Sequence, residues 1–353
     1  MNWRDRHLWL VVLTGFLAGA LGVLLAVWGN PENSGICVSC FMETSAGALG
    51  LHNNERMEYL RPELVGFVLG AFASAALFRE FKTRGGSAPL ARIFSGILLI
   101  VGCAVFIGCP IKLVLRLAAG DLTAVSGLFG LVAGVGLGLR GLAHGLHLGR
   151  TQRDPSGSGF LVPGLFLLLL VFYFVRPGFL LESPYGGAAR HAPGMIALAV
   201  GLLLGFLAQR SRFCITGGVR DSYLFGLRAP LLWGVIAFVG GALLVSLLTG
   251  RFQPGFYGQP GAHGELLWSG LGMLLVGWIS ALIGGCPFRQ LVKSGEGDTD
   301  AGLVVIGMLL GGGIVQSWGI AATSSGVSLA GKVAVLSGLM LVIVATLLLR
   351  EEA

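Results

Sequence analysis

Long apolar runs are the feature that most constrains this chain. Ten of them approach the length needed to cross a membrane, at 8–28, 61–78, 92–108, 122–140, 159–176, 193–209, 230–249, 265–284, 300–320 and 330–349. A hydrocarbon core of about 30 Å requires roughly 20 helical residues. Only 12% of the residues are charged, against about 25% in soluble domains. The sequence therefore predicts an all-α integral membrane protein of about ten spanning helices.

The basic residues separate the apolar runs. A net charge of +7 would suit nucleic acid, but these residues are placed as topology determinants are, so we expect no nucleic-acid partner. With the N-terminus in the cytoplasm, 16 of the 24 Lys and Arg residues lie inside and the other 8 lie outside. The excess of basic residues on the inside predicts this orientation.

The chain contains an internal repeat. Gly108-Cys109-Pro110 matches Gly285-Cys286-Pro287 at an offset of 177 residues (286 − 109), and the same offset relates Cys37 to Cys214. Both cysteine pairs have a spacing of 72 residues (109 − 37 and 286 − 214). The offset also relates Lys112 to Arg289, Arg116 to Lys293, Asp121 to Asp298, Gly130 to Gly307, Gly134 to Gly311, and Gly136 to Gly313. So many matches at one offset indicate two related halves.

The two halves are predicted to be inverted in the membrane. We place the first half at 1–149, followed by a linking span to 176, and the second half at 177–353. A polar linker lies between them at 150–159. Each half is expected to hold five spans, an odd number, so the second half enters the membrane from the opposite side. Transporters built this way have their site near the midplane, where the halves meet.

Four segments are too short to span and too apolar for loops, at 35–51, 109–119, 212–226 and 286–295. We interpret them as short re-entrant half-helices in an hourglass-shaped protein, since irregular backbone at membrane depth requires shielding by protein. Pro110 and Pro287 fit the first helical turn, where a missing N–H costs nothing. Cys109 and Cys286 are then expected at helix N-termini near the membrane centre.

Thiols at helix N-termini have a recognisable chemistry. The positive end of the helix dipole favours a thiolate, and its free N–H groups attract anions. Soft thiols suit a solute that carries sulfur or selenium. The expected substrate path is Cys37, Cys109, Cys214 and Cys286, supported by the cations Lys112, Arg116, Arg220, Arg289 and Lys293.

Two other cysteines are interpreted differently. Cys103 lies inside a spanning run without a repeat partner of its own kind, which favours a packing role. Cys40 follows Cys37 at the spacing of a redox pair or a metal site, although one such pair without further ligands indicates neither strongly. A disulfide between Cys37 and Cys40 is a further alternative.

The sequence resembles the YeeE/YedE family of bacterial inner-membrane proteins over nearly its whole length. The likeness rests on Gly285-Cys286 after a span, on residues 210–226, and on the inverted pairing of the halves. Family members include thiosulfate importers in which central cysteines pass the substrate on through S–H contacts. The resemblance implies those roles for Cys37, Cys109 and Cys286, with Cys214 as the further repeat-related thiol.

The first half resembles one branch of that family in particular. Residues 35–64, 103–122 and 284–300 are similar to YedE proteins associated with selenium metabolism. That resemblance implies a selenium substrate and a cytoplasmic TusA-like carrier as partner. The residues by themselves imply only a soft, anionic substrate.

Three functions are compatible with these features. The first is import of a selenium compound, the second is import of thiosulfate or a related sulfur anion, and the third is a membrane thiol oxidoreductase that uses Cys37 and Cys40. The sequence carries no motif for ATP, haem or a metal cage, so we expect a transporter without a cofactor rather than an enzyme. Glu43, Asp121 and Asp298 are the ionisable groups nearest the half-helices and are candidates for proton transfer.

Overall fold

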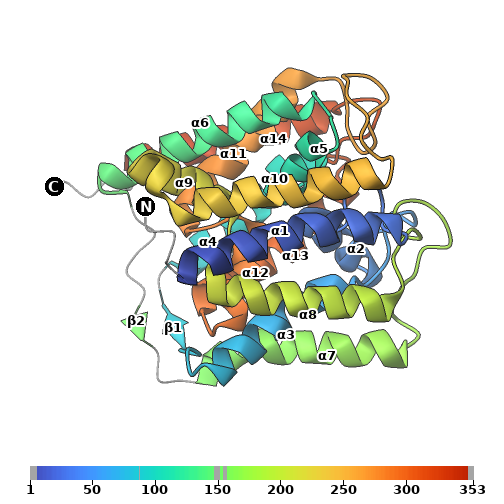
Figure 1. Ribbon diagram of the computed structural model, residues 1–353, viewed down its shortest axis with the longest axis horizontal. Coiled ribbons are helices and arrows are strands. Elements are labelled where there is room, and N and C mark those ends of the chain that lie inside the picture. The colour runs from blue at the N-terminus through green and yellow to red at the C-terminus, as the bar shows by residue number, and fades with distance from the viewer. Residues whose placement is uncertain (1–5, 87, 147–151, 154–156, 349–353) are drawn as a thin grey trace.

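The computed structural model describes residues 6–348 except 87, 147–151 and 154–156, so the linker expected at 150–159 lies partly outside the described residues. Its helices lie side by side in one bundle (Figure 1). They are α1 Arg6–Val27, α2 Val38–Ala48, α3 Pro62–Leu77, α4 Pro89–Phe106, α5 Pro110–Ala118, α6 Ala124–Ala143, α7 Leu161–Val175, α8 Gly194–Ser211, α9 Ile215–Phe225, α10 Pro230–Leu248, α11 Leu266–Ile283, α12 Pro287–Gly295, α13 Thr299–Ser317 and α14 Leu329–Leu348.

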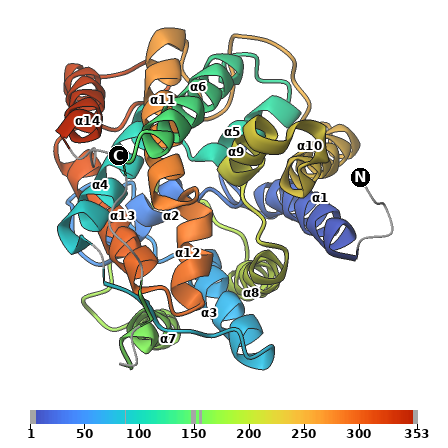
Figure 2. The same cartoon turned by 90° about the vertical axis from the view of Figure 1, so that its left-hand side faces the viewer.

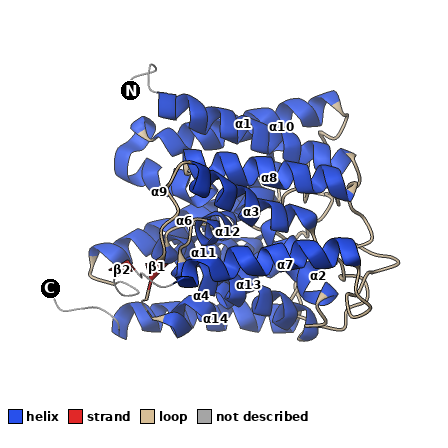
Figure 3. Ribbon diagram, turned by 90° about the horizontal axis from the view of Figure 1, so that it is seen from below, coloured by secondary structure: helices blue, strands red, loops and turns tan. Residues whose placement is uncertain are grey.

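Little of the described chain is strand. A short pair joins β1 (Arg84–Gly85) to β2 (Gln152–Arg153) in antiparallel register, and Figure 3 shows it at one end of a helical molecule. Two 3-10 turns, at Gly157–Phe160 and Gly226–Arg228, complete the regular structure. The expectation of an all-α membrane protein is confirmed.

Nine helical segments of the described chain are long and apolar enough to cross a membrane. The tenth expected span, at 61–78, corresponds to α3, which has only 16 residues. A helix of that length reaches about 24 Å, less than a core of about 30 Å. The helix is short because Pro62 fixes its start and the backbone turns left-handed at Arg79. The prediction of ten full-length spans is therefore corrected to nine.

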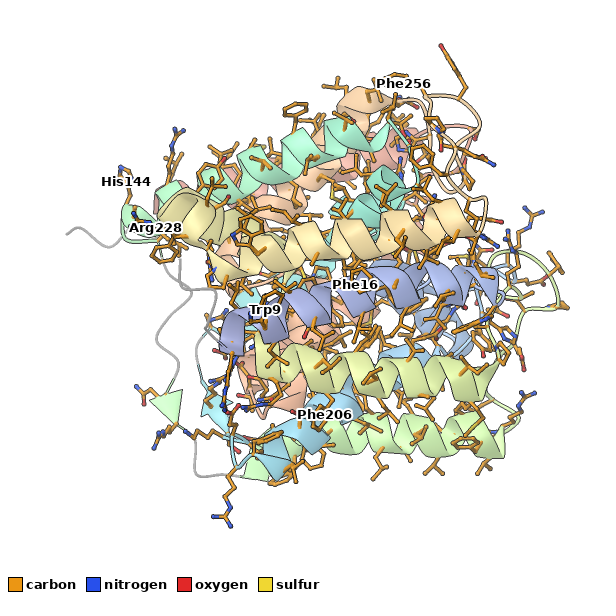
Figure 4. All side chains as sticks on the ribbon, viewed as in Figure 1. Trp9, Phe16, His144, Phe206, Arg228 and Phe256 are labelled. Atoms are coloured by element: carbon orange, nitrogen blue, oxygen red, sulfur yellow. The ribbon has the colours of Figure 1, made fainter. Side chains whose placement is uncertain are left out.

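Large apolar side chains cover the outside of the bundle. Trp9 is 55% exposed, and Phe16 projects from the same helix (Figure 4). On α7, only 22% of the apolar window is buried. In water such a surface would be unfavourable, whereas lipid tails accept it without cost.

Glycines allow the spanning helices to pack closely in pairs. A Cβ atom at Gly130 or Gly134 of α6 would overlap carbonyl oxygens of α11, and one at Gly307 of α13 would overlap a carbonyl oxygen of α4. Close backbone approach through small residues is the usual way for helices to associate in membranes. The pairs α6–α11 and α4–α13 are related by the 177-residue offset, since α4 and α11 have bounds that differ by it.

Four short helices lie among the long ones. The bounds of α2 and α9 differ by 177 residues, and so do those of α5 and α12. In the view along the bundle, α2 and α12 lie near its middle, with long helices around them (Figure 2). Every residue of α12 except Lys293 is buried. The short helices therefore bring their N-termini into the core.

The two ends of the bundle can be told apart by ion pairs. Arg84 of β1 lies 3.2 Å from Asp298, which precedes α13, and Arg212 at the end of α8 lies 3.1 Å from Glu296. These groups define the β1 end. Helix α13 runs away from it for 19 residues, about 28 Å, so Gln316 lies at the opposite end.

Candidate functional site

A cysteine stands directly before each short helix. These N-cap residues are Cys37, Cys109, Cys214 and Cys286, and each has extended backbone dihedrals. None of the four side chains is more than 3% exposed. Proline occupies the first turn of α5 and α12, as the sequence predicts. The fold thus points four thiols at the positive ends of helices inside the bundle.

The two thiols of the second half are in contact. The Sγ atoms of Cys214 and Cys286 lie 3.5 Å apart. Cys214 Sγ also accepts hydrogen bonds from the backbone N–H groups of Gly217 (3.3 Å) and Cys286 (3.4 Å), and lies 3.3 Å from the hydroxyl of Thr216. This sulfur is surrounded by donors, so the position favours a negatively charged atom.

A cavity of about 220 Å³ reaches Cys214 from the β1 end. We call it the Cys214 cavity; its basic lining residues are Arg212, Arg220, Arg289 and Lys293, and no acidic residue lines it. The acids lie behind the cations: Arg212 and Arg289 lie 3.1 and 3.0 Å from Glu296, and Lys293 lies 3.3 Å from Asp298. The cavity therefore presents positive charge to a solute.

All four cysteines of the first half gather at one place. The Sγ atoms of Cys37 and Cys40 lie 2.8 Å apart, and the thiols of Cys37 and Cys109 also interact. Cys103 interacts with the hydroxyl of Ser39 and lies within electrostatic range of the other thiols. Sequence reasoning assigned Cys103 to packing and missed this cluster. Its repeat position, occupied by Ser280, was the available signal.

A second cavity, of about 450 Å³, reaches Cys40 from the opposite end of the bundle. We call it the Cys40 cavity. Glu43 lines it and accepts a hydrogen bond from Gln316, whose amide oxygen in turn accepts one from Asn54 (2.8 Å). Five of its lining residues correspond by the offset to residues of the Cys214 cavity: Cys40 to Gly217, Glu43 to Arg220, Asn54 to Leu231, Ala104 to Ala281, and Ile107 to Gly284.

Thiols also lie between the two cavities. Cys109 is within electrostatic range of Cys286 of the other half, and it interacts with Cys37 on its own side. The series Cys40, Cys37, Cys109, Cys286 and Cys214 therefore runs from one cavity to the other. All five are free thiols. The arrangement offers a soft solute a succession of S–H groups.

The two basic residues of the first half do not share one environment. Arg116 is fully buried, pairs with Asp121 at 2.6 Å, and donates to the hydroxyl of Thr123 and the carbonyl oxygen of Phe106. This network holds the start of α6 and uses the charge internally. Lys112 is also buried, but its ammonium lies within electrostatic range of Cys37 and Cys40.

The cysteines are better described as thiol pairs than as metal ligands. Within the part of the chain that the structure describes, no group of three or more His, Cys, Asp or Glu side chains is arranged to hold a metal ion. Cys37 and Cys40 have a hydroxyl neighbour, Ser39, rather than further ligands. What the site can provide is soft hydrogen bonding and positive charge.

The comparison with known proteins concerns the second half. Residues 210–352 match the family model described as Sulphur transport, and no curated protein matches the chain. The matched region includes α9, α12, both thiols of the second half and the basic residues of the Cys214 cavity. The C-terminal half of this multi-pass membrane protein thus carries a domain of the sulphur transport family, YeeE/YedE.

Proposed function

We propose that the protein transports a soft anion containing selenium or sulfur across the bacterial inner membrane along its central thiols. The observation that carries this proposal is the series of five thiols between two cavities at opposite ends of the bundle. A packing role would not require the cysteines to meet one another, nor a cavity to reach each end of the series.

The path is proposed to work by exchange of hydrogen bonds. An anion in the Cys40 cavity accepts an S–H hydrogen bond at its soft atom, then passes to Cys37, Cys109 and Cys286 in turn. Backbone N–H groups around Cys214 and the cations of its cavity stabilise the anion at the β1 end. With the N-terminus in the cytoplasm, the β1 end is cytoplasmic and the direction is import. No step requires a covalent bond to the substrate.

The two halves are proposed to form an inverted repeat. In this arrangement α2 and α5 enter the membrane from outside as re-entrant half-helices, and α9 and α12 enter from the cytoplasm. The equal bounds of the short helices at the 177-residue offset support it. The basic residues at the β1 end would also suit an acidic face of a TusA-like carrier that receives the product.

Uptake by purified protein in lipid vesicles tests the path. The probes are thiosulfate, selenite and hydrogen selenide, each with Cys109→Ala, Cys286→Ala and unaltered protein. We expect uptake of at least one probe, and a fall of at least tenfold in both variants at equal protein content. Normal uptake by both variants would refute the thiol path.

The choice between selenium and sulfur is settled by competition in the same vesicles. Selenium import predicts that a selenium probe displaces labelled thiosulfate at lower concentration than unlabelled thiosulfate does. The similarity of the first half to selenium-associated proteins favours this result, whereas the match of the second half to the sulphur transport family is neutral between them. The reverse order of displacement would identify a sulfur importer.

A membrane thiol oxidoreductase is the second candidate, because the Sγ atoms of Cys37 and Cys40 lie only 2.8 Å apart. Such an enzyme must cycle this pair between dithiol and disulfide and pass electrons on. Cys40→Ser would abolish an oxidoreductase, whereas a transporter would keep Cys37 and much of its uptake. Retained uptake in Cys40→Ser therefore excludes the redox function.

A further inference from the structure

One hydroxyl in the Cys214 cavity has no hydrogen-bond partner. Ser280 lines this cavity and is 1% exposed, and its Oγ atom makes no hydrogen bond to any described residue. Serine and threonine in helices commonly donate to the carbonyl oxygen four residues earlier. Ser211 and Thr346 do so, at 2.8 and 2.7 Å. Ser280 does not, so its donor is unused inside the protein.

A second donor in the same cavity is only partly satisfied. Arg289 is 7% exposed, and its Nη1 atom lies 3.0 Å from Glu296 Oε1 without the alignment of a hydrogen bond. Buried polar groups are nearly always hydrogen-bonded, so each exception requires an explanation. Here two exceptions line one basic cavity beside Cys214. An anion with oxygen atoms would satisfy both.

The repeat indicates that this position has a chemical purpose. The 177-residue offset places Cys103 where the second half has Ser280, and Cys40 where it has Gly217. In the first half these positions belong to the thiol cluster. The second half has a hydroxyl and a glycine instead, so its two remaining thiols lie beside an oxygen-based donor. A hydroxyl is a far better donor to oxygen than a thiol is.

We propose that Ser280 is a specificity-determining residue of the Cys214 cavity, which donates a hydrogen bond to an oxygen atom of the transported anion. Arg289 holds the same oxygen end, while the soft atom of the anion faces Cys214 and Cys286. The substrate class is then an anion that has both a terminal sulfur or selenium atom and oxygen atoms. The inference rests on the proposed transport function, because it needs the substrate to occupy this cavity.

The test uses two oxygen-bearing probes and one without oxygen. Labelled thiosulfate and selenosulfate carry the oxygen atoms, and thiocyanate, a soft anion without oxygen, serves as competitor. For Ser280→Ala in vesicles we expect the KM of the oxygen-bearing probe to rise at least fivefold, while the inhibition constant of thiocyanate stays within twofold. Ser280→Thr, which keeps the hydroxyl, should restore the KM. Ser280→Cys, which copies the first half, should not.

Each outcome decides one claim. An unchanged KM in Ser280→Ala overturns the inference, and so does an equal weakening of thiosulfate and thiocyanate. Gel filtration of the detergent-solubilised variants, together with the rescue by threonine, separates lost recognition from misfolding. If Cys286→Ala is inactive while Ser280→Ala is normal, only the present inference fails. If Cys286→Ala is normal, or unaltered protein takes up neither oxygen-bearing probe, the account of transport fails with it.

Discussion

The two cavities occupy related positions in the two halves, yet they present opposite chemistry. Where the Cys214 cavity has Arg220, the Cys40 cavity has Glu43. Where the second half has Gly217, the first has Cys40, so one cavity is soft and the other is basic. A shared backbone framework has thus been given two different linings. For an anion the difference supplies a direction, from the thiol-rich end toward the cationic end.

The buried acids of the two halves give the largest expected difference. Asp121 pairs with Arg116 where both side chains are 0% exposed, whereas its repeat mate Asp298 pairs with Lys293 and Arg84, which are 19% and 35% exposed. Breaking a fully buried pair costs about 3–5 kcal/mol, and weakening an accessible one costs about 1 kcal/mol. Asp121→Asn should therefore destabilise the protein far more than Asp298→Asn.

Thermal unfolding of both variants in the same detergent measures this difference. Asp298→Asn is a matched control, because asparagine can still cap α13 by accepting the hydrogen bond from the backbone N–H of Ala301. Equal losses of stability would mean that the two ion pairs contribute alike and that the halves do not differ here.

The charge of the linings gives the next largest effect. Arg220→Glu places a negative charge in the Cys214 cavity, and we expect the KM for thiosulfate to rise about tenfold, equivalent to ~1.4 kcal/mol. Glu43→Gln removes a negative charge from the other cavity and should lower the KM about twofold. Vesicle uptake at low and high salt measures both, and the effect of Arg220→Glu should shrink as salt increases.

Arg176→Glu is the control for this change. It alters the net charge equally, but its ion pair with Glu182 is exposed and lines neither of the two cavities. An equal rise of KM in Arg176→Glu would show that overall charge matters and the lining does not.

The turn before each Gly-Cys-Pro or equivalent motif gives a smaller effect. Gly284 has a φ of +79° and open space around its Cα, while its repeat mate Ile107 holds a left-handed conformation at +62°. Gly284→Ala should cost about 1 kcal/mol from backbone strain alone. Gly240→Ala, in α10 with similar open space, should stabilise slightly because alanine favours helix. Thermal unfolding that shows no difference between these two variants would contradict the strain.

The smallest effect concerns Glu80 at the rim of the β1 end. Hydrogen bonds from Gln209 and Arg210 lower the pKa of this carboxyl. Its stabilising contribution is therefore complete above the unfolded value of about 4.3 and is lost as the pH falls through the lowered pKa. Because the side chain is 37% exposed, we expect less than about 1 kcal/mol. Glu80→Gln should flatten the pH dependence of thermal unfolding below about pH 4.3, and an unchanged curve would remove Glu80 from the account.

The short helices could be predicted because their signals are local. A proline after a cysteine fixes the start of α5 and α12, and one offset transfers the pattern between halves. The shortened α3 could not be predicted, because an apolar run does not reveal where a tertiary turn such as that at Arg79 stops the helix. The matching cations Arg116 and Lys293 could not be told apart either, since their difference lies in burial.

The thiol cluster required the fold as well. Cys103 lies six residues before Cys109, on the preceding helix, and only the chain reversal at Ile107 brings it toward α2. Arg212 and Arg289 likewise come from different helices that converge on one cavity. Sequence spacing indicated which residues carry chemistry but not which of them meet.

Two-sided labelling of single thiols tests the central claim most directly. Variants that retain only Cys40 or only Cys214 are reconstituted, and a small anionic methanethiosulfonate that cannot cross lipid is added to one face of the vesicles at a time. The account predicts that Cys40 reacts from one face and Cys214 from the other, and that thiosulfate or selenosulfate slows both reactions. Reaction of both thiols from the same face would contradict a path that joins opposite sides of the membrane.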